Sequence, residues 1–305
     1  MKCIRFHQFG GPEVLKFEEV QDPVPQAGEV LVRMTATSLN PIDMKLRSGA
    51  MQAFMPVTLP MIPGNDVSGV VAGIGPGVNH FELGQKVIGR SISTYAELVL
   101  VKASELTHLP DGVDPLTAAA LPVVVTTGDQ LIRACVASAQ PTRILIAGAL
   151  GSVGRAAVHA ARKTTGVYVI AAVRSKQLDE ARLLLASEVI ALDDTAAMAA
   201  LPAVDAVADT IGGKAAAALL PKVKPGGIFA TITGLPASAA EFPQVQAKMI
   251  GSHADPSKVR EFADDLRDGK FHLPIRAKFP LAQAAEAHTM AESGGGSAGK
   301  ILLFV

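Results

Sequence analysis

Glycines fall at every third position of one short stretch, Gly148-Ala149-Leu150-Gly151-Ser152-Val153-Gly154. A run typical of a buried β-strand, 143–147, precedes it, and an alanine-rich run typical of a helix, 152–163, follows it. The first turn of such a helix offers free N–H groups and the positive end of the helix dipole to an anion. Gly151 would let the backbone approach a pyrophosphate, and Gly154 would let helix and strand pack closely. We therefore expect Leu150, Gly151, Ser152, Val153 and Gly154 to bind a dinucleotide.

Two cationic residues, Arg174 and Lys176, follow the end of the strand expected after this helix. Arg174 lies 20 residues beyond Gly154 (174 − 154 = 20), where a site for NAD usually has an acid that binds the ribose 2′-hydroxyl. A guanidinium there can instead bind a 2′-phosphate in a forked geometry, while Lys176 adds a charge and Ser175 a hydroxyl. Arg174, Ser175 and Lys176 therefore predict NADPH as the cofactor. The alternative is that both cations are solvated charges at the start of a helix.

Strands and helices alternate through the surrounding region. We expect strands at 143–147, 168–173, 188–192, 204–209, 227–233 and 246–250, and further helices at 177–186 and 214–223. Continuous apolar strands that alternate with helices indicate a parallel sheet buried on both faces. Ligands bind such sheets beyond the carboxyl ends of the strands. The residues expected there, in the same dinucleotide site, are Asp209, Ile211, Thr233, Gly234 and Leu235.

The first hundred residues and the last fifty have a different texture. Short β-branched runs at 30–34, 67–74, 86–88 and 95–101 are separated by Gly and Pro turns, which predicts a small β-barrel or sandwich. Asp114 is a plausible helix N-cap, with Pro115 at the first helical position. Two helices at 256–268 and 281–292, a Gly-rich loop at 293–297 and a strand at 300–305 are expected near the end. Since a short final strand gains most by pairing with an existing sheet, we expect residues 1–116 and 254–305 to form one domain and residues 117–253 the other.

Composition excludes several classes of protein. The chain has 305 residues, of which 49% are hydrophobic and 18% charged, with a formal net charge of +0, as in an ordinary globular enzyme. No strong overall field favours nucleic acid or an anionic membrane, so we expect neither as a partner. We find no signal peptide and no apolar run long enough to cross a bilayer, and we predict a cytoplasmic location. The two cysteines cannot form a disulfide framework or a thiolate zinc site on their own.

Dispersed, ordered motifs along the whole chain are similar to those of a known family. They include Gly10-Gly11-Pro12-Glu13-Val14, Asn40-Pro41-Ile42-Asp43, Pro63-Gly64-Asn65-Asp66-Val67, Asp209-Thr210-Ile211-Gly212-Gly213 and Gly299-Lys300-Ile301. The chain resembles the zinc-independent medium-chain dehydrogenases/reductases of the quinone oxidoreductase (zeta-crystallin-like) type. The resemblance implies an α/β fold, with a GroES-like β-rich catalytic domain plus a Rossmann domain that carries a doubly wound parallel sheet. It also implies a cofactor cleft between the domains and a homodimer, for which 246–250 is a plausible edge strand.

The zinc-dependent branch of this superfamily has different residues at the corresponding positions. Asn40 stands where that branch usually has a cysteine, and Asn65-Asp66 replaces its His-Glu pair, so we expect no metal. Short-chain reductases need a Tyr with a Lys four residues on. Tyr95 and Tyr168 are followed at that spacing by Val99 and Ala172, so that alternative lacks its catalytic pair.

The remaining chemistry is hydride transfer to a small acceptor that is already electrophilic, such as a quinone or an α,β-unsaturated carbonyl compound. The resemblance implies that Asn40 and Thr127 are catalytic residues near the nicotinamide, where Asn40 would stabilise an oxyanion or hold the ribose. Asn40 could equally be a turn residue before Pro41, and Thr127 a hydroxyl satisfied by helix backbone. We expect Asp43 to orient local backbone, Asp66 to brace the site and Lys300 to be a surface lysine. None of the seven histidines shows ligand spacing, and none is assigned a role.

Two departures from the family pattern bear on the substrate. Residues 189–192 lack the tyrosine that often lies near the adenine, and Met44, Met51, Phe54 and Met55 stand where tyrosines often follow the Asn-Pro motif. Met and Phe suit a flexible apolar pocket, although ordinary packing explains them equally well. The competing hypotheses are a non-catalytic NADPH-binding sensor or structural, crystallin-like protein, and an alcohol dehydrogenase, which would need a metal.

Overall fold

The computed structural model describes residues 1–136, 143–293 and 299–305. The chain divides into two compact units, Met1–Val123 together with Ala254–Val305, and Val124–His253. The first boundary lies later than the expected one after residue 116, because helix α2 (Pro115–Ala118) packs against strands of the first unit. The second boundary falls between His253 and Ala254. Of the Gly-rich loop expected at 293–297, only Ser293 lies within the described residues.

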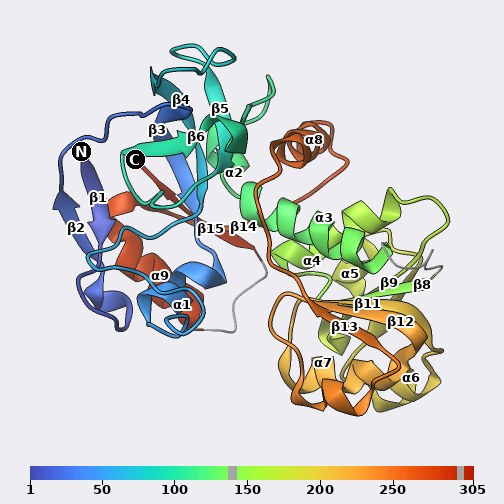
Figure 1. The fold of residues 1–305 in the computed structure, drawn as a ribbon. Helices are drawn as coiled ribbons and strands as arrows, with labels where there is room; N and C mark the ends of the chain where they lie inside the picture. Colours follow the sequence, from blue (N-terminus) through green and yellow to red (C-terminus); the bar gives the residue numbers. More distant parts are fainter. Residues whose placement is uncertain (137–142, 294–298) are drawn as a thin grey trace. The chain divides into compact units, whose positions relative to one another are not determined.

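The first unit is rich in short strands, as the turn-punctuated sequence predicts (Figure 1). A seven-stranded sheet has the order β14-β15-β3-β4-β5-β7, with β6 also paired to β3, and β1 and β2 form a separate antiparallel pair. The strands are β1 (Lys2–Arg5), β2 (Lys16–Glu19), β3 (Glu29–Ser38), β4 (Asp66–Ile74), β5 (Lys86–Arg90), β6 (Leu98–Lys102), β7 (Leu106–His108), β14 (Ile275–Pro280) and β15 (Lys300–Phe304). Strand β6 begins at Leu98 rather than at residue 95, because the backbone of Tyr95 pairs elsewhere, with Ile4 and Pro63.

The end of the chain returns to this first unit, which confirms the prediction for the final strand. Strand β15 lies between β14, to which it is parallel, and β3, to which it is antiparallel. Leu302 and Leu303 are fully buried there. The last strand is therefore an internal strand of the sheet, and its apolar side chains contribute directly to the core.

Helices of the first unit begin at the signals expected from sequence. The Asp114 side chain accepts hydrogen bonds from the backbone N–H groups of Leu116 and Thr117, with Pro115 at the first helical position. A helix directly after Asn40 was not predicted, although Asn40, Pro41 and Asp43 supply a cap, a first-turn proline and a capping-box acid. The α-helices are α1 (Pro41–Arg47), α2, α8 (Pro256–Arg267) and α9 (Ala284–Glu292), with 3₁₀ turns at Pro12–Val14, Ala103–Glu105 and Leu281–Gln283.

The second unit is a six-stranded, all-parallel sheet in the order β10-β9-β8-β11-β12-β13. Its strands are β8 (Arg143–Ala147), β9 (Tyr168–Val173), β10 (Glu188–Ala191), β11 (Val204–Asp209), β12 (Val223–Thr231) and β13 (Gln246–Met249). Its helices are α3 (Pro122–Val136), α4 (Ser152–Arg162), α5 (Leu178–Arg182), α6 (Thr195–Ala200) and α7 (Gly213–Leu219), with 3₁₀ turns at Ser175–Gln177, Leu220–Lys222 and Ala237–Glu241. The expected alternation of strand and helix is confirmed, and β13 is an edge strand of this sheet.

Both faces of the parallel sheet are buried, which explains its continuous apolar strands. Along β8, Ile144 and Ile146 pack in one core with α3, α4 and α5, whereas Leu145 and Ala147 pack in another with α6 and α7 (Figure 1). The strand order is that of a doubly wound Rossmann sheet, and it reverses between β8 and β11. The carboxyl ends of these two strands are therefore the expected place for a ligand. Within the described residues, the structure contains no helix that is both long enough and apolar enough to cross a membrane.

Candidate functional site

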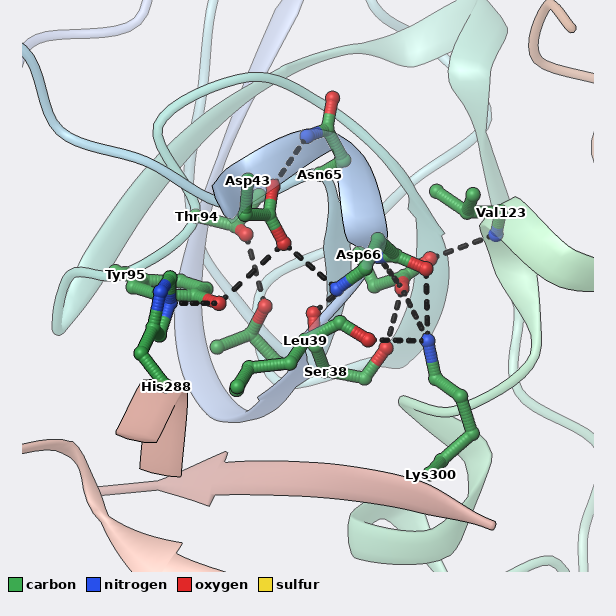
Figure 2. A network of polar contacts seen from close by, with 12 residues as sticks. Ser38, Leu39, Asp43, Asn65, Asp66, Thr94, Tyr95, Val123, His288 and Lys300 are labelled. Carbon is green, nitrogen blue, oxygen red and sulfur yellow. Dashed lines mark hydrogen bonds and ion pairs between the residues drawn. The ribbon is translucent and has the colours of Figure 1, made fainter. Parts of the chain in front are cut away.

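A buried polar network occupies the first unit where β3 meets α1 (Figure 2). Asn40 is hydrogen-bonded within it to Asp43, Asp66 and Lys300. Asn40 is 2% exposed and forms the N-cap of α1. Its backbone N–H donates to Asp43 Oδ2 at 2.8 Å. The capping box at the start of the helix thus holds Asn40 in a fixed orientation.

The side-chain amide of Asn40 is fully engaged within the first unit. Its Nδ2 donates to Asp66 Oδ2 at 2.7 Å and to the Ser38 carbonyl at 3.3 Å, while its Oδ1 accepts from Lys300 Nζ at 2.7 Å. An amide nitrogen has two hydrogens, so both are in use. Asn40 could donate to a substrate oxyanion only by giving up one of these bonds.

The carboxylate of Asp66 connects several segments of the first unit. Its Oδ1 accepts from the backbone N–H of Val123 at 2.7 Å, one of the N–H groups in the first turn of α3 that have no acceptor four residues earlier in the helix. Its Oδ2 accepts from the amide of Asn40 and, through a very short contact, from the Ser38 hydroxyl. Asp66 is 0% exposed and therefore acts as a brace in this structure.

Lys300 is buried, so its predicted place at the surface is wrong. Its side chain is 4% exposed, and Nζ donates to the Leu39 carbonyl and to Asn40 Oδ1, both at 2.7 Å. Asp66 Oδ2 lies 3.7 Å from the same nitrogen. Burial lowers the pKa of Lys300, while Asp66 opposes that shift. Its position as the first residue of an apolar strand gave no sign of burial, whereas the buried Asp66 partner explains it.

A second part of the network leads from Asp43 to α9 (Figure 2). Arg47 Nη1 donates to His288 Nδ1 at 2.8 Å, which leaves the proton of the neutral ring on Nε2. His288 Nε2 then donates to the Tyr95 oxygen at 3.2 Å, and the Tyr95 hydroxyl donates to Asp43 Oδ2 at 3.3 Å. Sequence analysis missed this arrangement, because Arg47 and His288 are far apart in the chain and show no common motif.

Burial controls the ionisation of this second part. It raises the pKa of Asp43 to about 6, against the donors Asn40 and Asn65 that favour the carboxylate. It lowers the pKa of His288 to about 3, which agrees with the neutral ring that the Arg47 contact requires. Burial also raises the pKa of Tyr95 well above its ordinary value. Of Asp43 and His288, Asp43 therefore titrates nearer to neutral pH.

The side chains around Asn40 do not make up a familiar zinc site. Among the residues that the structure describes, no three His, Cys, Asp or Glu side chains are grouped so that they could hold a metal ion. The Lys300 ammonium is the cation beside Asp66. Both cysteines, Cys3 and Cys135, are buried and unpaired with each other.

In the second unit, the glycine turn follows β8 at the carboxyl end of the sheet. Gly148 has a positive φ of 75°, and the Gly151 amide donates back to the Gly148 carbonyl at 2.9 Å. A Cβ on Gly154 would meet the Gly148 oxygen at 2.1 Å, so close packing of helix and strand requires this glycine. A Cβ on Gly151 would meet only that oxygen, at 3.2 Å, and otherwise project into open space.

The first turn of α4 has N–H groups available for a ligand. Its N-cap is Gly151, which has no side chain to accept a hydrogen bond. Over residues 1–136, 143–293 and 299–305, no acceptor is found for the N–H groups of Ser152, Val153 and Gly154. Leu150 is 2% exposed, so it would contact a ligand only through its backbone. The turn therefore fits the anion site that its sequence predicts.

The predicted phosphate-binding residues lie together after β9. Arg174, Ser175 and Lys176 are all exposed. The N–H and hydroxyl of Ser175 both donate to Asp193 Oδ1, at 2.7 and 2.8 Å. Sequence analysis missed Asp193, which follows β10, although the parallel pairing of β9 and β10 brings the two strand ends together.

The other predicted cofactor-binding residues follow β11 and β12. Asp209 is buried, and its carboxylate accepts from the N–H groups of Ile211 and Gly212 and from the hydroxyls of Thr231 and Thr233. It therefore joins two strand ends. The side chains of Ile211 and Leu235 are 41% and 47% exposed, and Thr233 is also exposed. Gly234 has a positive φ of 112°, and Thr127 is buried on α3.

Known proteins share this combination of units. A family model described as alcohol dehydrogenase GroES-like domain matches residues 26–111, and one described as zinc-binding dehydrogenase matches residues 184–303. A GroES-like unit interrupted by a doubly wound parallel sheet defines the medium-chain dehydrogenase/reductase class, and this chain has that fold.

Individual relatives show to which family within this class the chain belongs. The chain is 32% identical to a quinone oxidoreductase of Pseudomonas aeruginosa over 94% of this chain and 95% of that protein. The structure of the quinone oxidoreductase from Coxiella burnetii matches with a TM-score of 0.88 and 27% identity, over 100% of this chain and 99% of that one. The Escherichia coli quinone oxidoreductase complexed with NADPH has the same fold, with a TM-score of 0.84, 22% identity and 100% coverage of both chains. The chain belongs to the quinone oxidoreductase family.

Proposed function

We propose that the chain is an NADPH-dependent reductase that transfers hydride to quinones or α,β-unsaturated carbonyl compounds without zinc. The observation that carries the proposal is the pairing of an open glycine turn after β8 with two exposed cations after β9. The family relationship supports it, as does the binding of NADPH by a relative of the same fold.

The second unit has the groups that such a cofactor needs. Its pyrophosphate would accept from the N–H groups of Ser152, Val153 and Gly154. Gly151 leaves open space for the approach, because a Cβ there would touch nothing but the Gly148 oxygen. Arg174 and Lys176 would hold the 2′-phosphate. When bound, NADPH supplies the hydride.

The first unit would bind the acceptor and stabilise the developing oxyanion. Asn40, in this unit, and Thr127, on α3 in the second unit, remain the proposed catalytic residues. Donation by Asn40 would replace its longer bond, the one to the Ser38 carbonyl, while the shorter bond to Asp66 keeps the amide in place. We propose that zinc has no part, because Asn40, Asn65 and Asp66 offer a single carboxylate and no thiolate or imidazole, beside a lysine that already balances the charge.

Steady-state kinetics with NADPH, NADH and a panel of small quinones and alkenals tests the proposal. The wild-type protein should oxidise NADPH faster than NADH, and Arg174→Asp should remove most of that preference by repelling the 2′-phosphate. Arg182→Asp, which makes the same charge change on α5 at a residue paired with Asp179, is the control and should keep the preference. An unchanged cofactor ratio in Arg174→Asp would refute the assignment.

Cofactor-binding and metal measurements on the same samples distinguish the reductase from the alternative functions. Tight NADPH binding with no turnover across the whole panel would favour a non-catalytic sensor or structural protein. Stoichiometric zinc in a metal analysis would revive the alcohol dehydrogenase hypothesis. A homodimer formed through β13 and a cytoplasmic location remain predictions, and light scattering tests the first of them.

A further inference from the structure

Two of the donors expected to bind a 2′-phosphate, both from Ser175, are already occupied by a carboxylate of the chain itself. Asp193 Oδ1 accepts from both the backbone N–H and the hydroxyl of Ser175, at 2.7 and 2.8 Å. These are two of the groups that the loop after β9 would offer to a phosphate oxygen. Asp193 thus accepts both hydrogen bonds from Ser175, as an anionic ligand would.

The sheet fixes this arrangement. Strands β9 and β10 are parallel neighbours, and the Leu192 N–H donates to the Val173 carbonyl at 2.7 Å just beyond their paired residues. Asp193 follows Leu192 directly, and Ser175 lies two residues beyond Val173. The next acid, Asp194, is instead the N-cap of α6, because its carboxylate accepts from the N–H groups of Ala196 and Ala197. Asp193 is therefore the carboxylate that faces Ser175.

Asp193 is ionised at neutral pH. The hydrogen bonds from Ser175 are the largest cause that lowers its pKa, and the charge of Arg174 acts in the same direction. A negative charge is consequently present next to the cations that would attract the phosphate. It both holds the Ser175 donors and repels a second anion.

We propose that Asp193 determines cofactor specificity by weakening the binding of NADPH relative to NADH. This inference rests on the proposed function, since it takes the loop after β9 as the 2′-phosphate site. A 2′-phosphate must displace the carboxylate from Ser175 or bind beside it, whereas the 2′-hydroxyl of NADH brings no charge into conflict with it. Asp193 thereby limits a preference that Arg174 and Lys176 create.

Two substitutions separate charge from hydrogen bonding. Asp193→Asn removes the charge but keeps an oxygen that Ser175 can donate to, and Asp193→Ala removes both. The side chain is at the surface, so both variants should fold. The ratio of dissociation constants, Kd for NADPH over Kd for NADH, should fall by about three- to tenfold in Asp193→Ala and by less in Asp193→Asn, given the modest strength of exposed charge contacts. Nicotinamide fluorescence titration measures both constants.

A matched control and a second background make the test specific. Asp179→Asn removes a nearby exposed carboxylate that pairs with Arg182 instead, and it should leave the ratio unchanged within about twofold. In a Ser175→Ala background, Asp193→Ala should lower the ratio of dissociation constants by less, because the Ser175 hydroxyl that the substitution would free for the phosphate is absent.

The outcomes distinguish this inference from the proposed function. An unchanged or increased ratio in both Asp193 variants, with NADPH still bound, would overturn the role of Asp193 alone. Failure of the wild type and of every variant to bind either dinucleotide would overturn the proposed function and this inference with it.

Discussion

Three donors converge on the buried carboxylate of Asp43, namely the Asn40 N–H, the Asn65 amide and the Tyr95 hydroxyl. Such bonds favour the charged form, whereas complete burial favours the neutral one, and burial is the larger effect. Its pKa therefore rises from 3.8 to about 6 on folding. A residue that holds backbone and side-chain donors in place thus also makes stability depend on pH.

The direction of that dependence follows from the raised pKa. The folded state holds the Asp43 proton more tightly than the unfolded state. Protonated Asp43 therefore contributes to the free energy of unfolding in full below pH 3.8, and this contribution is lost as pH rises through about 6. The loss should amount to about 3 kcal/mol (6 − 3.8 = 2.2 pKa units). Urea unfolding of the wild type and of Asp43→Asn between pH 4 and pH 7 measures it. The difference in stability between the two proteins should change over this window, and two parallel curves would contradict the prediction.

At the scale of single elements, the glycine turn and α4 depend on two glycines for different reasons. A Cβ on Gly154 would strike backbone, with the Gly148 oxygen at 2.1 Å and the Ala149 Cα at 2.8 Å. A Cβ on Gly151 would fit beside the Gly148 oxygen but would occupy the surface that a pyrophosphate needs. Stability and binding should therefore separate between the two positions.

Alanine substitutions test this separation. Gly154→Ala should lower the free energy of unfolding by roughly 1–3 kcal/mol, because α4 must move away from β8. Gly151→Ala should change it by less than about 0.5 kcal/mol and instead raise the Kd for NADPH. Chemical denaturation and fluorescence titration of the two variants measure these effects. Equal losses of stability at both positions would show that packing alone explains both glycines.

The six strands of the parallel sheet were predictable because each carries its own signal, whereas helices α3 and α6 were not predicted and β12 (Val223–Thr231) begins four residues before the expected strand at 227–233. Strands β8, β9 and β11 have the predicted bounds, since the residues in them are apolar or lie at a strand end, apart from Asp205 in β11. The N-cap at Asp114 was equally local. Helix α5 is shorter than expected, because a 3₁₀ turn at Ser175–Gln177 precedes it and Leu185 has a positive φ of 55°. Local patterns define where elements occur better than where they end.

Contacts between distant residues were beyond local patterns. The burial of Lys300 depends on Leu39 and Asn40, which lie 261 and 260 residues away in the sequence. The pairing of Ser175 with Asp193 depends on the order of β9 and β10, which a list of strands does not contain. Sequence therefore predicted the residue types around each candidate site, whereas the tertiary fold decided which of their atoms remain available.

At the scale of the molecule, the first unit is assembled from two separated stretches of chain, Met1–Val123 and Ala254–Val305. Strand β15 joins them, because it pairs with β14 on one side and with β3 on the other. It also carries Lys300, which is bound to the carbonyl of Leu39. The integrity of the first sheet therefore depends on the last residues of the sequence.

Truncation after Gly299 tests this dependence. Without β15, backbone amides of β3 and β4 should lose most of their protection from hydrogen exchange, while those of β8 and β11 in the other unit should keep theirs. Removal of Val305 alone is the control, because this residue is 61% exposed, lies beyond the strand and contributes one long backbone bond, to the Thr35 carbonyl at 3.4 Å. Full protection of β3 in the longer truncation would contradict the expected dependence. Hydrogen-exchange mass spectrometry resolves the segments.

The split construction has a consequence for biosynthesis. The stretch Val124–His253 is continuous, so all six strands of its sheet have been made while residues 254–305 are still awaited. The N-terminal sheet remains incomplete until then, because Ala36–Ser38 of β3 lack their β15 partners and the core around Val30 and Val32 lacks Leu281, Ile301 and Leu303. If synthesis stalls before β15 is made, the nascent chain would therefore carry a folded parallel-sheet unit and an incomplete, aggregation-prone first unit. Pairing of β15 with β3 would complete the first unit.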